Sequence, residues 1–401
     1  MLRALRHPGY RAYSAAQIVS LMGTWMQNVA QSWLIYRLTG SALGLGIVAF
    51  ASQIPLFLLG PVAGLLADRF PKRIVLSVVQ SLFALLAGLL AVLTFAEWVT
   101  PTHVTVLALC YGLVSAFDVP TRQSLVLEMV GREDLPNAIA INSSIFNAAR
   151  IVGPALGGIV VATVGEGPCF LINALSYLGT IAVLLRLKLV AVAPPPHGGS
   201  FLRQIAAGFA FVAGAKRLRA VFLLVGVISV AVLPYMVLLP LFADRVLGLG
   251  ADGLGGLTGA SGGGALLGAL VLASRPPSFD FESLIGVATV AGGMMLIVFA
   301  MSTELWLSFG ALLLVGFCMM TQLGASNTFV QMNIPEGMRG RIMGIYSMVF
   351  LGLSPMGALS AGALSERIGE TRTIALGGSM AVLGGLSFVV ARIVARGRDT
   401  P

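Results

Sequence analysis

Long apolar stretches recur along the whole chain, each about the length that crosses a membrane as a helix. About 20 helical residues span the roughly 30 Å hydrocarbon core of a bilayer, whereas a barrel would use shorter, alternating strands. Lipid leaves no backbone group unpaired, so stretches this continuously apolar predict transmembrane helices. We count about twelve, near residues 14–36, 42–66, 74–96, 102–118, 138–162, 168–187, 218–242, 253–274, 283–302, 305–327, 341–364 and 373–394.

The composition excludes a water-soluble domain. Of the 401 residues 57% are hydrophobic and only 10% are charged, whereas soluble proteins carry about 25% charged residues. Residues 1–13 are basic, but the apolar run that follows is too long for a signal peptide and shows no small-residue cleavage site. We expect an all-α polytopic membrane protein. Its expected location is the plasma membrane, which in a bacterium is the inner membrane.

The loops differ in their Lys and Arg content, which predicts the orientation. With both termini in the cytoplasm, most of the 25 Lys and Arg residues fall on the inner side. Only Arg37, Arg245, Arg367 and Arg372 then lie outside, and Arg150 lies within a span. The net charge of +9 is scattered over many short loops, which favours attraction to lipid over binding of nucleic acid.

One longer connection follows the sixth span and divides the helices into two sets of six. It contains a Pro/Gly hinge and then an amphipathic segment in which Phe201, Ile205, Phe209 and Val212 recur at helical spacing. Such a segment is expected to lie along the inner membrane surface. Two pseudo-symmetric six-helix bundles are typical of transporters. We therefore divide the chain into an N-terminal bundle, a cytoplasmic linker with an amphipathic helix, and a C-terminal bundle: residues 1–187, 188–217 and 218–401.

The loop after the second span, GPVAGLLADRFPKRIVL, resembles the loop signature of the major facilitator superfamily. A small residue at its start allows close helix approach, and its acidic residue can face the positive end of a helix. An ordinary solvated charged turn is the alternative, and Pro71 stands where the signature prefers glycine. The matching residues are Gly64, Asp68, Arg69, Lys72 and Arg73.

Residues 118–158 are similar to the loop and fifth span of exporters in the drug:proton antiporter branch, including its siderophore-exporter-like members. Gly153-Pro154-x-x-Gly157-Gly158 resembles the antiporter motif of that span. Proline bends the helix, and the glycines would let it pack tightly on the other bundle and seal the outer side. A kink without a role is the alternative. The resemblance implies a transporter with a conformational gate formed by these residues.

Polar side chains inside the spans are the candidates for a substrate cavity, because a polar group that faces lipid costs free energy. Hydrogen bonding between helices, worth about 0.6 kcal/mol each, is the alternative for any single residue. The candidates are Gln27, Asn28, Gln31, Gln53, Asn147, Arg150, Tyr235, Gln322 and Tyr346.

Arg150 needs a partner, because arginine is always protonated and costs a few kcal/mol at mid-depth in a membrane. No carboxylate appears at a comparable depth in the sequence. Helix carbonyls with the Asn147 amide, Asp118 reaching inward, or an anionic substrate remain as partners. We hypothesise an electropositive cavity suited to neutral or anionic cargo.

Asp118 ends the predicted fourth span, beside the Asp68 loop. We expect it to pair with Arg69 or Arg73 when the cavity opens outward, and so to act as a two-state gate. A solvated charge at a helix end is the alternative. Some members of the family that this chain resembles carry an acidic residue in the first helix, where this chain has Asn28 or a neighbouring amide. Proton coupling would therefore have to use Asp68, Asp118 or a charge exchanged with the substrate.

These patterns predict a secondary active transporter that exports a small organic molecule by alternating access, with proton antiport as one possible drive. A lipid or lysolipid flippase on the same fold and an uptake carrier remain alternatives. An intramembrane enzyme would need clustered catalytic groups, yet His7, His103 and His197 all lie outside the spans. We expect a monomer in the bilayer with a small-molecule substrate, and no cofactor or metal, since Cys110 and the other two cysteines show no metal spacing.

Overall fold

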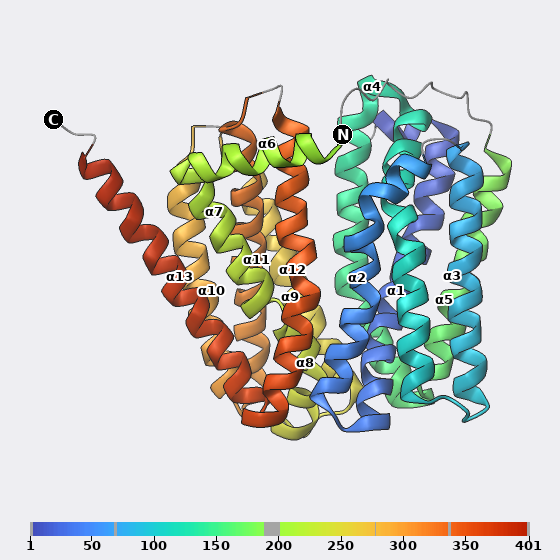
Figure 1. Ribbon diagram of the computed structural model, residues 1–401. Coiled ribbons are helices and arrows are strands. Elements are labelled where there is room, and N and C mark those ends of the chain that lie inside the picture. The colour runs from blue at the N-terminus through green and yellow to red at the C-terminus, as the bar shows by residue number, and fades with distance from the viewer. Residues whose placement is uncertain (1–2, 68–69, 188–200, 277, 336–337, 399–401) are drawn as a thin grey trace. The chain divides into compact units, whose positions relative to one another are not determined.

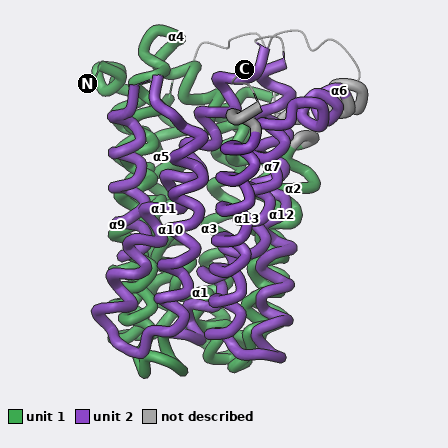
Figure 2. The backbone as a smooth tube through the Cα atoms, turned by 90° about the vertical axis from the view of Figure 1, so that its left-hand side faces the viewer, with its two compact units in different colours: residues 1–195, 243–259 green, residues 196–242, 260–401 purple. Residues whose placement is uncertain are grey.

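The structure is a computed structural model that describes residues 3–67, 70–187, 201–276, 278–335 and 338–398 (Figure 1). Within these residues the chain forms helices and no strands. Contacts between residues divide it into two compact units, shown in different colours in Figure 2. Unit 1 comprises Met1–Pro195 with Ala243–Gly259, and unit 2 comprises Pro196–Phe242 with Ala260–Pro401.

Unit 1 is a bundle in which α1 packs against α4 and α5, α2 packs against α4, and α3 packs against α4 and α5. The helix α1 begins at a proline, which suits the first helical position, and ends where Gly40 adopts the left-handed conformation. The elements are η1 (Arg3–Arg6), α1 (Pro8–Thr39), α2 (Ala42–Ala67), α3 (Lys72–Phe95), α4 (Pro101–Val164), α5 (Glu166–Arg186) and the first part of α9 (Ala251–Ala273).

The helix α4 is two membrane crossings joined at a glycine. Its 64 residues would measure about 96 Å as one straight helix, three times the thickness of a bilayer core. Gly131 interrupts it with φ of 71° and ψ of 178°, a conformation that glycine adopts without strain. Residues 101–130 and 132–164 are therefore the fourth and fifth crossings.

Unit 2 is a second bundle, in which α10 packs against α11 and α13, and η2 packs against α12 and α13. The helix α6 lies across the ends of α7 and α12 (Figure 1). The seventh crossing contains a π-helical turn, η2, that ends two residues before Pro234, which cannot donate a backbone hydrogen bond. The elements are α6 (Phe201–Gly214), α7 (Lys216–Val227), η2 (Ile228–Val232), α8 (Tyr235–Leu241), α10 (Phe281–Met301), α11 (Leu305–Met332), α12 (Arg339–Ile368) and α13 (Glu370–Arg398), with η3 (Phe242–Val246) at the boundary between the units.

The prediction of an all-helical fold with about twelve crossings is confirmed. Ten helices of the described chain are long and apolar enough to cross a membrane, and one of these, α4, holds two crossings. The helix α1 is long enough at 32 residues but is not among the ten, since it carries the polar stripe. The amphipathic linker helix is present as α6, although Val212 is buried on it while Phe209 is exposed.

The predicted end of the fourth span was wrong. We placed it at Asp118, but the helix continues to Val130. Asp118 thus lies 17 residues after the start of α4 and 12 before Val130, about 25 Å and 18 Å along the helix. The charges are tolerated there because Asp118 and Arg122, one turn apart, neutralise each other.

Candidate functional site

The polar stripe of α1 divides between two environments. Gln27 is buried against α5, where Nδ2 of Asn173 donates a hydrogen bond of 2.7 Å to Oε1 of Gln27. One turn earlier, the hydroxyls of Thr24 and Tyr177 are 3.1 Å apart. Asn28, by contrast, is exposed. Gln27 therefore holds α1 against α5, the arrangement we gave as the alternative to a cavity lining.

Three other candidates of unit 1 are half-buried. Gln31 is half-buried on α1, and Nε2 of Gln53 donates to the Ala49 carbonyl at 3.4 Å. Nδ2 of Asn147 donates to the Ser143 carbonyl at 2.8 Å. These bonds within single helices leave part of each amide available to a ligand.

The three candidates of unit 2 are buried inside that unit. The Tyr235 hydroxyl lies 2.7 Å from the Ser261 hydroxyl on α9, and the Tyr346 hydroxyl donates to the Leu323 carbonyl at 3.0 Å. Gln322 is fully buried on α11, where its Nε2 donates to Ser326 and its Oε1 has no hydrogen-bond partner among the described residues. That these residues line a cavity with those of unit 1 stays a prediction.

Arg150 lies in the fifth crossing with an aromatic partner. It is 14 residues from the end of α4 at Val164, about 21 Å along the helix. Its Cζ is 5.9 Å from the centroid of the Trp25 ring on α1, and Trp25 in turn contacts Phe146 edge-on at 5.8 Å. Cation–π attraction operates at such distances. Within the described part of the chain, Arg150 forms neither a salt bridge nor a hydrogen bond, and Asp118 is not its partner.

Asp118 forms a buried ion pair inside unit 1. Arg122 donates to both of its carboxylate oxygens, at 2.7 and 2.9 Å from Nη2, and Nε donates at 3.1 Å. Gln80 on α3 donates a further bond of 3.1 Å to Oδ1. The side chain of Asp118 is 12% exposed and that of Arg122 is 25% exposed. This ion pair replaces the solvated helix end that we considered.

The expected pair between Asp118 and Arg73 is absent from this structure. Nη1 of Arg73 donates instead to the Leu187 carbonyl at 2.7 Å, which fastens the end of α5 to α3. Asp68 and Arg69 lie outside the described residues, and Gly64 lies in α2. The gate that we predicted for the outward-open conformation therefore stays a prediction.

The sequence reasoning missed most of the polar groups around this ion pair. Gln17 donates to the Tyr13 hydroxyl at 2.6 Å, and both residues are buried on α1. Tyr13 and Tyr177 lie within electrostatic range of both members of the pair. The signal that could have revealed the pair is the Asp-x-x-x-Arg spacing, which places the two charges on one helix face.

The antiporter-motif glycines are positions of close helix contact. A Cβ added to Gly157 would lie 2.9 Å from the Met26 Cα on α1. One added to Gly158 would lie 2.5 Å from the Ala251 carbonyl oxygen and 2.9 Å from the Gly255 Cα on α9. Pro154 is buried, and a Cβ added to Gly255 would lie 2.5 Å from its carbonyl oxygen. The motif therefore packs α4 directly onto α1 and onto the first part of α9.

Gly153, the first glycine of the motif, fixes the aromatic partner of Arg150. A Cβ there would lie 2.5 Å from the Trp25 Cβ and 3.0 Å from the Met22 carbonyl oxygen. Only glycine permits such an approach between helix backbones. The same motif thus sets the position of Trp25 relative to α4.

An ion pair and two hydrogen bonds fasten the end of unit 1 at which α1 ends and α5 begins. Arg37 donates to both carboxylate oxygens of the buried Glu166, at 2.8 and 3.2 Å. Nearby, the Tyr36 hydroxyl donates to Asp244 and Arg245 donates to the Gly40 carbonyl. A hollow of about 480 Å³ adjoins the first pair, and its lining includes Thr94, Phe95, Glu97 and Pro168.

Unit 2 has a charged cluster at the start of α10. Arg217 lies 2.8 Å from the buried Glu282, and Arg392 contacts Asp280, Glu282 and Ser283. Burial opposes ionisation of Asp280, but the Ser283 backbone N–H and the Arg392 charge lower its pKa below the ordinary value. The cluster therefore holds α7 and α13 to α10 through ionised groups. Among the residues described, no group of three or more His, Cys, Asp or Glu side chains could hold a metal ion.

Comparison with known proteins shows the family. The family model described as transmembrane secretion effector matches residues 1–399. The chain is 30% identical over 395 residues to the multidrug efflux pump Tap of Mycolicibacterium fortuitum, covering 94% of each chain. It is 26% identical over 400 residues to an enterobactin exporter of Escherichia coli, covering 98% of this chain and 94% of the exporter.

The fold is also that of solved transporters. The structure of a nucleoside transporter aligns with a TM-score of 0.77 at 15% identity, over 96% of this chain and 99% of that one. At this identity the likeness concerns the fold alone. With the family match over nearly the full length, the chain belongs to the transmembrane secretion effector family and is a multi-pass membrane transporter of the major facilitator superfamily.

Proposed function

We propose that the protein is a secondary active exporter of a small organic molecule that works by alternating access. The observation that carries this proposal is the family match over residues 1–399, together with full-length relatives whose names describe efflux and export. Those relatives act on different cargo, so the names support the direction of transport more strongly than the chemistry of the substrate.

The described side chains support transport through the membrane interior. Asn28 is exposed in the middle of α1, and Arg150 is partly exposed in the middle of the fifth crossing. Polar groups at such depth are costly in contact with lipid and normally face protein or water. Their placement fits a water-accessible substrate route.

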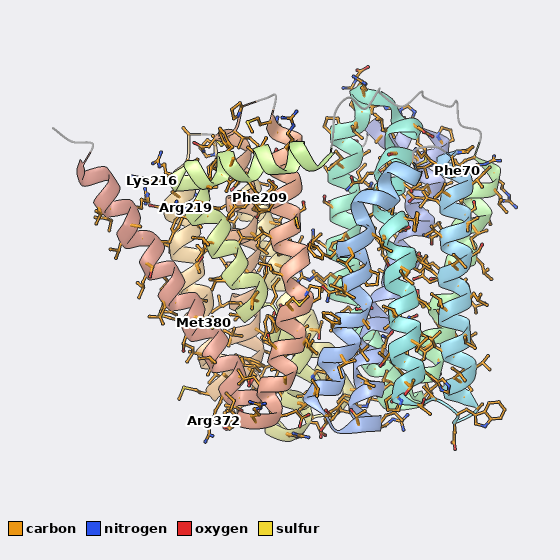
Figure 3. The ribbon with its side chains drawn as sticks, viewed as in Figure 1. Phe70, Phe209, Lys216, Arg219, Arg372 and Met380 are labelled. Atoms are coloured by element: carbon orange, nitrogen blue, oxygen red, sulfur yellow. The ribbon has the colours of Figure 1, made fainter. Side chains whose placement is uncertain are left out.

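For the orientation, the proposal keeps both termini in the cytoplasm. Within unit 2, Lys216 and Arg219 lie at the end where α6 lies, and Arg372 lies at the opposite end (Figure 3). The positive-inside rule then favours the α6 end as cytoplasmic. Reaction of single cysteines placed in α6 and beside Arg372 with an impermeant maleimide on intact cells tests this, and labelling in α6 would contradict it.

The first experiment is a search for cargo. The purified protein is screened by thermal shift against drugs, siderophores, nucleosides and lysolipids, and each compound that stabilises it is then loaded into cells. Cells that express the protein should lose the compound faster than cells with an empty vector. Equal loss, or faster uptake, would contradict export.

Proton exchange is the driving reaction that we test first. Inverted vesicles that contain the protein should accumulate the stabilising compound when their interior is acidified, because an exporter points into such vesicles. Accumulation should collapse when a proton ionophore removes the gradient. Accumulation that ignores the pH gradient would exclude proton coupling while leaving export intact.

A further inference from the structure

Arg150 and Phe146 lie one helical turn apart on the same face of α4, which places a cation beside an aromatic ring. Residues four apart on a helix have Cβ atoms about 6 Å apart. The Phe146 side chain is 45% exposed and Arg150 is partly exposed. Ser143, one turn before, is exposed on the same face. This face thus presents a guanidinium, an open aromatic ring and small polar groups.

The guanidinium has no anionic partner within the described chain. Among the described residues it contacts the Trp25 ring, at 5.9 Å from Cζ to the centroid. Cation–π contact offsets part of the cost of a buried charge, and it is weaker where water remains near. An arginine in mid-membrane is costly even so. An anion bound to the guanidinium would offset the part of this cost that the aromatic contact leaves.

The aromatic partner of the guanidinium is held from two sides. Trp25 is held by the close approach of its Cβ to Gly153, and its ring is held edge-on by Phe146. Contacts of this kind place binding groups in advance, so that little side-chain entropy is lost when a ligand binds. The arrangement therefore has the property of a prepared binding site rather than of a flexible surface arginine.

We propose that Arg150, Phe146 and Trp25 form a binding site for small aromatic anions, in which the guanidinium binds a carboxylate or phenolate group and Phe146 contacts the ring of the ligand. A planar guanidinium binds a carboxylate through two parallel hydrogen bonds, which a lysine does not reproduce. The one-turn spacing, with Cβ atoms about 6 Å apart, suits one ring that carries its acidic group directly. This inference rests on the proposed exporter function and specifies the class of its cargo.

The test compares two probes of nearly equal shape, salicylate and its uncharged amide, salicylamide. Binding of each to the purified wild-type protein in detergent is measured by isothermal titration calorimetry. A hydrogen bond to a charged group contributes about 1.5–3 kcal/mol, which corresponds to a preference for salicylate of about 10- to 150-fold. An equal affinity for the two probes, or binding of neither, would overturn the inference.

Variants then assign the preference to the site. Arg150→Gln should reduce the ratio of affinities to about one, and Arg150→Lys should leave a smaller preference, because the charge remains without the planar fork. Phe146→Leu should weaken the binding of both probes by the same factor and so leave the ratio of their affinities unchanged. The matched control is Arg132→Gln, which removes an exposed arginine of the same helix and should change neither affinity.

Size-exclusion profiles and thermal midpoints establish that each variant is folded. If Arg150→Gln does not fold, the other two variants still test the inference. An unchanged ratio of the two affinities in Arg150→Lys would overturn it, and so would loss of the preference for salicylate in Phe146→Leu. Failure here is separate from failure of the exporter proposal. A protein that expels other compounds without preferring salicylate contradicts only the site, whereas one that binds salicylate but expels nothing contradicts only export.

Discussion

Removing the carboxylate of Asp118 should destabilise unit 1 more than any other single polar change there. Asp118→Asn keeps the shape of the side chain but leaves the Arg122 charge buried without its partner. Breaking a buried ion pair from one side costs about 3–5 kcal/mol, and the residual exposure of 12% and 25% places the expected cost near the lower figure. The Gln80 amide would retain an acceptor in the asparagine, so little further loss is expected from it.

Replacing both charges should cost much less than removing one. The double variant Asp118→Leu/Arg122→Met removes the cost of desolvating both ions together with their attraction. Such exchanges often leave the stability unchanged. The expected coupling energy in a double-mutant cycle is therefore about as large as the costs of the two single substitutions added together. The exposed pair of Arg3 and Glu133, 3.7 Å apart, is the matched control, and Arg3→Gln should cost less than about 1 kcal/mol.

The free energy of unfolding is measured by titrating the purified protein from dodecyl maltoside into dodecyl sulfate, with circular dichroism as the signal. The ion pair predicts that Asp118→Asn is destabilised most, and that the double variant and Arg3→Gln are both destabilised much less. If Asp118→Asn and Arg3→Gln unfold at the same detergent ratio, the burial argument is wrong. If the double variant loses the sum of the two single variants, the two charges do not act as a pair.

Three further changes test other contacts. Gly158→Leu should lower stability by about 1–3 kcal/mol and abolish export, because even a Cβ would lie 2.5 Å from a carbonyl oxygen of α9. The control is Gly88→Ala, which should be neutral in the same unfolding and efflux assays, since the nearest atom to its Cβ is 3.9 Å away. Gln27→Leu removes one neutral bond between helices and should cost about 0.6 kcal/mol, so an effect as large as that of Asp118→Asn would refute its assignment as a local contact. Because the folded-state pKa of Asp280 is lowered, its pairing with Arg392 should stabilise the protein above the ordinary pKa of 3.8 and cease to do so as the pH falls through the lowered value. The difference in melting temperature between wild type and Asp280→Asn should accordingly shrink at the acidic end of a pH series, and a difference that grows there would contradict the sign.

The helical architecture could be predicted because hydrophobic length depends on the solvent alone. A run such as residues 74–96 must be a helix in lipid whatever its neighbours are, and α3 is found at Lys72–Phe95. The end of the fourth span was predicted wrongly because a charged residue that is considered alone suggests the end of a span. Asp118 and Arg122 lie inside the helix because each removes the cost of burying the other.

The role of a polar side chain depends on its neighbours, which are distant in sequence. Gln27 and Asn28 are adjacent in the chain and equally polar, yet one is buried against Asn173 and the other is exposed. A difference of one residue turns a helix side chain by about 100°, which is enough to move it from one helix contact to another. No local pattern contains the information that α5, and not water, lies opposite Gln27.

The contact between α1 and α5 has a consequence for how the chain is made. Thr24 and Gln27 find their hydrogen-bond partners 153 and 146 residues later, on a helix that the ribosome has not yet produced when α1 emerges. At about 5–20 residues per second, this delay lasts about 7–30 s. During that time α1, the least apolar crossing of unit 1, has to stay in the insertion machinery or be shielded by it. This lasts until α5 has been synthesised. Biosynthesis of this transporter is therefore most vulnerable at its first helix, and substitutions on α5 should impair the insertion of a segment synthesised long before them.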